Sequence, residues 1–265
     1  MKFELWSEWH YLFMAAPILI ILALYFALRN TSYKVRYSIG CVIGVLSLAV
    51  LIMRNIEIYM HNGFDPEIIP LQVCHFGNIM VFIALIFKSK TAGAIAWSLN
   101  MFAAYTSCIF ADSLANYNTI MSMRAQAYIW GHILIVIGAA YAVLLKIVRL
   151  DLKSFLYGLI VLVCLLIPAI VLNPFFRAKG NGINYFYIFD SNGVPFEFLW
   201  NEAFTHSYGA WFKINYLYTF SVIGIFLVII YLIYLSQKPL YKKNDLYDTS
   251  NVFIDLHNYL KLRLA

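Results

Sequence analysis

The chain has 265 residues, of which 63% are hydrophobic and 12% are charged. An ordinary globular domain is nearer half apolar and a quarter charged, so this composition excludes a typical soluble fold and favours a membrane protein. The formal net charge is +6, but the Lys and Arg residues lie in short polar stretches rather than on one dense basic face, which argues against nucleic-acid binding. The cysteines at positions 41, 74, 108 and 164 have no paired spacing that would indicate a disulfide framework or a zinc knuckle.

Seven apolar segments follow one another along the chain. Each has about the 20 residues that a helix needs to cross a hydrocarbon core about 30 Å thick. The expected helices are residues 11–28, 39–59, 70–87, 91–110, 125–148, 155–172 and 214–235. The third and fourth are joined by so short a link that they must form an antiparallel hairpin. The sequence therefore predicts an all-α, polytopic membrane protein with seven transmembrane helices.

The distribution of basic residues predicts the orientation of these helices. Thirteen of the nineteen Lys and Arg residues fall in the loops after the first, third and fifth helices or in the tail. Positively charged loops stay on the cytoplasmic side, so the amino terminus is expected outside and the carboxy terminus inside. The expected location is a cell membrane, with the bacterial plasma membrane favoured.

Two stretches lie outside the expected helices. Residues 173–213, rich in Asn, Gly and aromatic residues, form an outer loop that is expected to be a packed, functional cap on the membrane domain of residues 1–235. Residues 236–265 form a cytoplasmic tail. In it, Phe253, Leu256 and Leu260 have helical spacing and predict a short amphipathic helix that binds lipid or the loops.

Polar side chains within the expected helices gather near their outer ends, whereas the inner halves are almost purely apolar. Because buried polar groups in a membrane are costly, such a gathering indicates a functional site that faces the outer side. The polar residues on the second, third and fifth helices are Arg54, Asn55, Glu57, Gln72, Cys74, His75, Asn78, Gln126 and His132.

Cys74 and His132 are the candidates for catalysis. Cys74 lies about four residues inside its expected helix and His132 about seven inside its own, so their depths agree within one helical turn. A thiol with an imidazole at hydrogen-bond distance becomes a thiolate that attacks esters. For either residue alone, ordinary packing is the more common role, since a membrane cysteine usually behaves as a small hydrophobic residue.

Three segments, in order, resemble one known family. Ile69-Pro70-Leu71-Gln72-Val73-Cys74 is similar to its Leu-Pro-Leu-His/Gln-Leu-Cys signature, Trp130-Gly131-His132-Ile133-Leu134-Ile135-Val136 to its Ser-His-Gly-Leu-Ile-Val helix, and Gly182-Ile183-Asn184-Tyr185-Phe186-Tyr187 to its Gly-Thr-Asn-Tyr-Met-Tyr. The family is that of the YwaF-like bacterial membrane proteins, which includes the eukaryotic transmembrane protein 164 acyltransferases. The chain departs from the pattern at His75, where the family often has Asp, and it lacks the Lys-Pro that tends to follow the Asn-Tyr motif.

The resemblance implies a seven-helix acyl-exchange enzyme in which Cys74 is the nucleophile and His132 the base, with no metal and no cofactor. A membrane phospholipid would donate an acyl chain to Cys74 as a thioester. A lysolipid, an amine or a lipoprotein would then accept it. Exclusion of water would separate transfer from hydrolysis.

Each supporting residue also has an ordinary structural explanation. His75 points about 100° around the helix from Cys74, and Gln72 and Asn78 share its polar surroundings. Asn184 and Tyr185 are candidates for orienting the histidine or for stabilising an oxyanion, although such residues more often cap and pack. Three arginines are candidates for binding a lipid phosphate: Arg54, which an ion pair with Glu57 would otherwise explain, and Arg124 and Arg177, for which interfacial snorkelling is favoured.

Two other classes of function compete with acyl transfer. A zinc-dependent lipid hydrolase would use His75, His132, His206 and Asp112, but the seventh helix supplies no His. A transporter or receptor without enzymatic activity is permitted by seven helices alone. The chain shows neither a pair of broken helices in matching halves nor a Lys in the seventh helix.

Overall fold

The computed structural model describes residues 3–111, 114, 117, 119–179, 182–187, 197–207 and 213–240. Within this part the chain is all-α apart from one pair of short strands, as predicted for a polytopic membrane protein. Six helical segments of this part are long and apolar enough to cross a membrane. They contain the helices α1 (Glu8–Leu28), α2 (Tyr33–Asn62), α3 (Val73–Phe87), α7 (Met123–Leu144), α8 (Leu152–Ala178) and α9 (Tyr216–Ser236).

The expected fourth helix is helical but not uniform. It consists of α4 (Lys90–Ile95), a π-helical turn η2 (Ala96–Asn100) and α5 (Met101–Ile109), which follow one another without a break. None of the three reaches a spanning length alone, so the count of seven spans stays a prediction. The short link before it is confirmed, because Lys88 ends α3 in the left-handed region at φ 53° and Ser89 caps α4.

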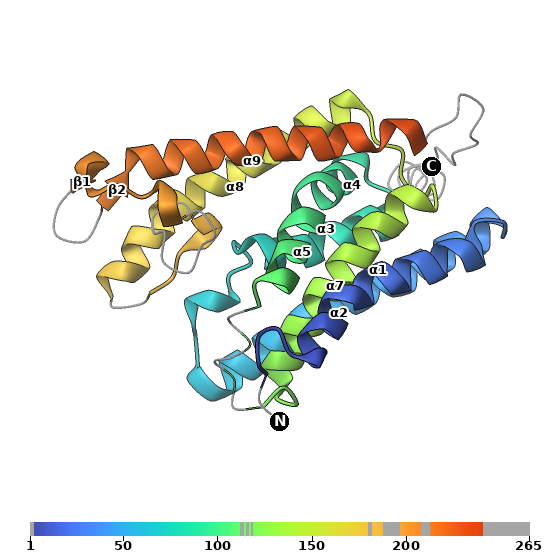
Figure 1. Ribbon diagram of the computed structural model, residues 1–265, viewed down its shortest axis with the longest axis horizontal. Coiled ribbons are helices and arrows are strands. Elements are labelled where there is room, and N and C mark those ends of the chain that lie inside the picture. The colour runs from blue at the N-terminus through green and yellow to red at the C-terminus, as the bar shows by residue number, and fades with distance from the viewer. Residues whose placement is uncertain are drawn as a thin grey trace, which may run out of the picture.

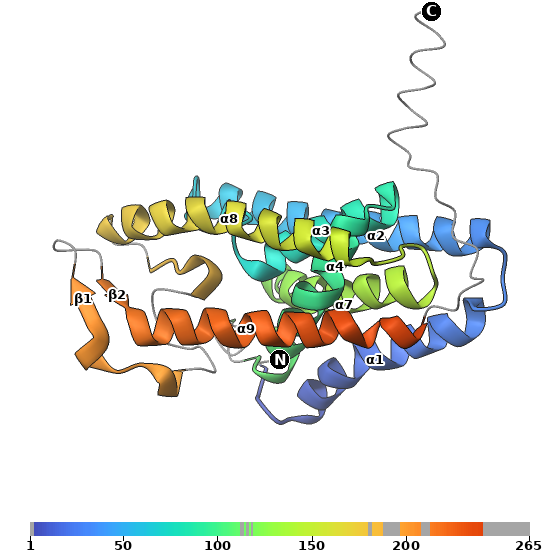
Figure 2. The same ribbon diagram turned by 90° about the horizontal axis from the view of Figure 1, so that it is seen from above.

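Two long helices run along one side of a bundle. Figure 1 shows α8 and α9 along the top, with α1, α2, α3, α5 and α7 beneath them, and Figure 2 shows α4 between α8 and α9. α4 packs on α8 and η2 packs on α9. The Trp97 indole donates a hydrogen bond to the carbonyl of Ile233 at 2.9 Å, which ties η2 to α9.

Small residues let the bundle helices approach closely. A Cβ added at Gly138 of α7 would collide with Val81 of α3, and one at Gly44 of α2 would come within 3.3 Å of Leu85 of α3. Without water between helices, association depends on such close packing, and small residues permit it. A hydrogen bond also joins α7 to α2, because the Tyr141 hydroxyl donates to the carbonyl of Arg36 at 2.7 Å.

α8 begins with a capping box. Asp151 accepts a hydrogen bond from the Ser154 amide at 2.7 Å, and the Asp151 amide donates to the Ser154 hydroxyl. Partial burial raises the pKa of Asp151, but the bonds from Ser154 and the Lys90 ammonium at 3.3 Å outweigh it, so the pKa of this carboxyl lies below its ordinary value.

The expected outer loop begins later than predicted. α8 continues through residues 173–178, and Asn173 and Pro174 lie within its last two turns. Beyond it lie η3 (Tyr185–Tyr187), η4 (Glu197–Leu199), η5 (Glu202–Phe204) and the antiparallel strands β1 (Thr205–Ser207) and β2 (Lys213–Asn215), which pair His206 with Ile214. After α9 the described chain ends with η6 (Lys238–Leu240). The predicted tail helix lies outside the described residues.

Candidate active site

Cys74 is the second residue of α3, in the first turn of a helix whose start has no side-chain cap. The short helix η1 (Pro66–Ile68) leads into this start, and Gln72 occupies the N-cap position without a side-chain hydrogen bond to the helix. The first hydrogen bond of α3 is that of the Phe76 amide to the Gln72 carbonyl at 3.0 Å. The amides of Val73, Cys74 and His75 are therefore left without an intrahelical acceptor, as in the first turn of any helix. The partial positive charge there favours a thiolate.

His132 faces this thiol from α7. Its ring is buried, and Nδ1 lies 2.6 Å from the carbonyl of Tyr128, one turn earlier in the same helix. A carbonyl only accepts hydrogen bonds, so Nδ1 carries the proton and Nε2 is the basic nitrogen. The Tyr128 ring supports the imidazole at a centroid distance of 4.2 Å.

The two candidates meet as their sequence depths predicted. Cys74 and His132 lie close enough for their charges to interact and for a hydrogen bond between their side chains. A third group completes the surroundings, because the Ser107 hydroxyl of α5 lies 3.9 Å from Cys74 Sγ. The arrangement is a thiol beside a basic imidazole nitrogen, which is what nucleophilic attack on an ester requires.

Two asparagines hold the first turn of α3 in place. Asn78 accepts a hydrogen bond from Ser47 at 2.8 Å and donates one to the carbonyl of Cys74 at 3.1 Å. Asn100, from the π-helical turn, donates to the carbonyl of Val73 at 3.0 Å. Asn78 was expected to support the site, and its observed role is to anchor Cys74 to α2.

His75 and Arg54 are two further candidate residues near Cys74. His75 is 9% exposed, and its Nδ1 has no hydrogen-bond partner within the described residues. Its charge interacts with Arg54 and with His132. An ion pair with Glu57, which was the alternative explanation for Arg54, does not occur within the described residues. Arg54 instead binds Glu67 at 2.7 Å, because Glu67 at η1 packs over the end of α2, where Asn55 also donates to the Ile68 carbonyl.

The segment 182–187 is fixed against three helices. Tyr185 is fully buried, its backbone is bonded at both ends by Asn173 of α8, and its hydroxyl donates to the Pro66 carbonyl at 2.6 Å. The Tyr218 hydroxyl of α9 donates to the Tyr187 carbonyl at 2.8 Å. Tyr185 is thus a structural anchor, and the hydroxyl that would reach an oxyanion is already bonded elsewhere.

Asn184 and Tyr185 were the expected candidates in this segment, but Tyr187 is the residue on which the charge of Cys74 acts. Although 44% of Tyr187 is accessible, desolvation by the surrounding protein raises the pKa of Tyr187 to about 12, and the charges of Cys74 and Glu67 add to the rise. The phenol therefore keeps its proton at neutral pH and can donate a hydrogen bond. Asn184 contributes its carbonyl, which accepts from the Tyr187 amide at 3.1 Å.

The remaining two arginines differ in their partners. Arg177 donates from Nε to the Ile183 carbonyl at 3.2 Å and so helps to fix the segment 182–187. Arg124, at the start of α7, is half-buried, and no ion pair or hydrogen bond of its side chain occurs within the described residues. Its charge acts on Tyr117 together with that of Arg54, so both arginines lie at the same end of the bundle.

Comparison with known protein families identifies a relationship. The model of the TMEM164 family matches residues 5–234. The chain belongs to the TMEM164 family. No curated protein and no solved structure matches it. The region shared with the TMEM164 family contains all ten candidate site residues, from Arg54 to Tyr185.

The alternative zinc site is not assembled in the part of the TMEM164 member that the structure describes. In that part no three His, Cys, Asp or Glu side chains come together in a way that could hold a metal ion. His206 lies on β1 with its ring against Tyr216, and Asp112 falls outside the described residues.

Three neighbours of the thiol were missed by the sequence analysis. Ser107, Tyr128 and Tyr187 are single polar or aromatic residues that stand in no motif with Cys74, except that Tyr187 ends the Asn-Tyr segment. A helical count from His132 would have found Tyr128, since a residue four positions earlier shares the same face. Nothing in the sequence indicates Ser107.

Proposed function

We propose that this TMEM164 family protein is a membrane-embedded, cysteine-dependent acyltransferase that works as a phospholipid transacylase. The observation that carries the proposal is the pair formed by Cys74 and His132, in which the Tyr128 carbonyl occupies Nδ1 and leaves Nε2 for the thiol proton. The uncapped start of α3 supports it with a local positive potential.

The first half-reaction loads the enzyme. His132 Nε2 takes the thiol proton, and Cys74 Sγ attacks the ester carbonyl carbon of a phospholipid. The carbonyl oxygen becomes an oxyanion that the free amides of Cys74 and His75 stabilise. When the intermediate collapses, the ester bond breaks, His132 returns the proton to the departing glycerol oxygen, and an acyl thioester remains on Cys74.

The second half-reaction unloads it. The hydroxyl of a lysolipid, or an amine, gives its proton to His132 Nε2 and attacks the thioester carbon. The sulfur leaves, and the proton on His132 restores the thiol. Water in the second position would give hydrolysis instead, so exclusion of water from the site favours transfer.

The donor follows from depth and side. With the amino terminus outside, the start of α3 lies near the outer interface, beside the glycerol esters of outer-leaflet lipids. Arg124 is the best placed arginine for the lipid phosphate, since Arg54 and Arg177 already bind Glu67 and Ile183. A guanidinium holds a phosphate through charge-assisted hydrogen bonds.

The decisive experiment uses purified protein in liposomes that contain a labelled diacyl lipid and a lysolipid but no CoA. Labelled acyl chains should reach the lysolipid, and mass spectrometry should find an acyl adduct on Cys74 that neutral hydroxylamine removes. Cys74→Ser and His132→Ala should abolish transfer, whereas Cys164→Ser, on the exposed face of α8, should leave it unchanged. Full activity of Cys74→Ala would refute the covalent mechanism, and a strict need for acyl-CoA would refute the transacylase.

A second experiment tests the phosphate contact. Arg124→Gln should mainly raise the apparent KM for the donor lipid and leave kcat nearly unchanged, because the arginine would bind substrate and transition state alike. Arg29→Gln is a suitable control, since Arg29 follows α1 at its far end and lies over the rings of Tyr25 and Phe26. An equal effect of both substitutions would contradict the assignment.

A further inference from the structure

The Ser107 hydroxyl lies beside Cys74 and can form a different hydrogen bond once the thiol has lost its proton. Its hydroxyl donates to the Ala103 carbonyl at 3.0 Å, so the only hydroxyl proton is in use. In the 3.9 Å contact between Ser107 Oγ and Cys74 Sγ, Ser107 therefore gives no proton to the neutral thiol, whose own proton is directed to His132 Nε2 in the proposed mechanism. The same turn of α5 is held against α7, because the Tyr128 hydroxyl donates to the Ser107 carbonyl at 3.0 Å.

Removal of the thiol proton allows a hydrogen bond to form across this contact. A thiolate only accepts hydrogen bonds, and the Ser107 hydroxyl lies 3.9 Å from the sulfur. Rotation about the Cβ–Oγ bond alone turns the hydroxyl proton from Ala103 to the sulfur. The Ala103 carbonyl keeps the helical bond from the Ser107 amide, so no buried acceptor is left without a partner.

We propose that Ser107 is a hydroxyl switch, bonded to Ala103 beside the neutral thiol and to Cys74 Sγ beside the thiolate. No covalent bond of Ser107 forms or breaks. The thiol proton goes to His132 Nε2, and the serine proton stays on its oxygen. The inference deepens the proposed function, because the thiolate is the reacting form of Cys74 in that mechanism.

Other titratable and charged groups lie around Cys74, and substitution of Ser107 removes none of them. They are His132 and Tyr128 of α7, His75 of α3, Cys108 of α5 and Tyr187 of the segment 182–187, with Arg54 of α2 beyond His75.

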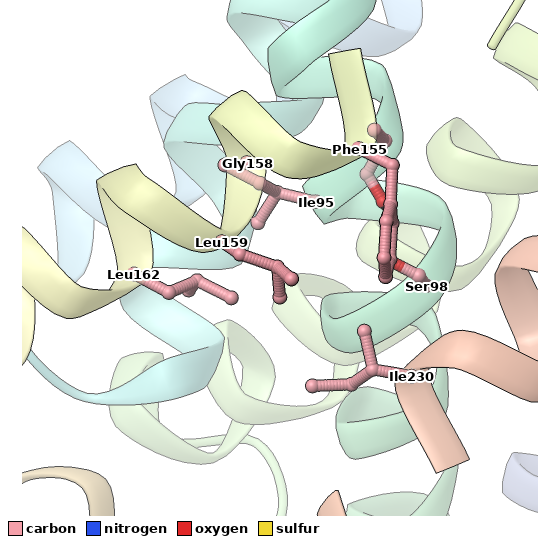
Figure 3. A pocket seen from close by; sticks show the side chains of 8 residues that line it. Ile95, Ser98, Phe155, Gly158, Leu159, Leu162 and Ile230 are labelled. Carbon is pink, nitrogen blue, oxygen red and sulfur yellow. The ribbon is translucent and has the colours of Figure 1, made fainter. Parts of the chain in front are cut away.

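The same helical segment supplies a matched control. Ser98 is buried, and its hydroxyl donates to the Ala94 carbonyl four residues earlier at 2.5 Å, which is the same type of bond that Ser107 makes. Figure 3 shows Ser98 beside an apolar recess lined by Phe155 and Ile230, among others. Ser98→Ala therefore removes an equivalent helical bond in surroundings that hold no thiol.

The test measures the rate at which iodoacetamide alkylates Cys74 as a function of pH. Full-length protein in detergent is used, and the Cys74 peptide is quantified by mass spectrometry. Loss of a hydrogen bond to a charged group should reduce the thiolate population about tenfold, which moves the alkylation profile of Ser107→Ala about one unit to higher pH. Ser107→Thr, which keeps the hydroxyl, and Ser98→Ala should follow the wild-type profile.

If Ser107→Ala does not fold, Ser107→Val is compared with Ser107→Thr, since these side chains have nearly the same shape and differ in the hydroxyl. A profile of Ser107→Ala or Ser107→Val that coincides with wild type would overturn the switch, as would an equal shift in Ser98→Ala. Because alkylation requires no lipid substrate, the switch and the acyl-transfer proposal can fail separately.

Discussion

Among the long helices that the structure describes, α3 alone begins without a side-chain cap, and Gln72 occupies its N-cap position. In the described part of the chain, α1, α2, α7, α8 and α9 each begin with a Ser, Asp or Asn whose side chain accepts a hydrogen bond from the first turn. Gln72 makes no such bond at α3. An Asp at this N-cap position would accept from the amides of Cys74 or His75, which are the groups assigned here to the oxyanion. We therefore predict that Gln72→Asp makes the protein more stable and less active.

The two effects have opposite signs and different sizes. A good N-cap residue contributes about 1 kcal/mol, which for a protein of this size corresponds to a rise in Tm of roughly 2–4 °C. Loss of one oxyanion donor lowers kcat by about 10²–10³-fold, and the new carboxylate also repels the thiolate. Gln72→Asn separates the two causes, because it caps the helix without adding charge, and Gln72→Ala leaves the start uncapped.

Thermal unfolding in detergent and acyl transfer in liposomes are the two assays. Gln72→Ala should resemble wild type in both, Gln72→Asn should gain stability and lose activity, and Gln72→Asp should lose the most activity. Wild-type turnover by a Gln72→Asp protein whose Tm has risen would show that the amides of α3 take no part in the reaction. A loss in Gln72→Ala as large as that in Gln72→Asp would assign the effect to the glutamine side chain itself.

Three further predictions concern packing, charge and topology. Gly138→Ala should lower stability by about 1–3 kcal/mol through its collision in the α3–α7 contact, whereas Gly224→Ala, where no atom lies within 4 Å of the added Cβ, should not lower the Tm. Because the folded-state pKa of Asp151 is depressed, its ion pair stabilises above the ordinary carboxyl pKa and is lost as the pH falls through the lower folded value. Asp151→Asn should thus cost under about 1 kcal/mol at pH 7, and melts of the two proteins should converge in acid. In intact cells an impermeant maleimide should label His61→Cys but not Ser89→Cys, and the opposite pattern would reverse the orientation.

The sequence was sufficient to find the helices and the two candidate catalytic residues, because both are governed by local rules. Span length and apolar composition identified the long helices, and counting residues from the expected helix starts placed Cys74 and His132 at one depth. Long-range pairings were harder to predict. One explanation considered for Arg54 was an ion pair with Glu57 of its own helix. Its partner Glu67 is thirteen positions away, and the folding of η1 over the end of α2 brings the two charges together.

The π-helical turn explains why Ser107 could not be assigned to the site from its position in the sequence. A straight α-helix through residues 90–109 would fix the direction of every side chain by the 3.6-residue period. A π-turn inserts about one extra residue, which rotates everything after it by about 100°. In this chain the turn at Ala96–Asn100 precedes α5, so the face that carries Ser107 differs from the one a regular helix would present. Asn100, the last residue of the π-turn, contacts α3: its side chain donates to the Val73 carbonyl and packs against Gly77. A tertiary contact with α3 thus accompanies the irregular turn, and the same turn directs α5 so that its hydroxyl meets the thiol.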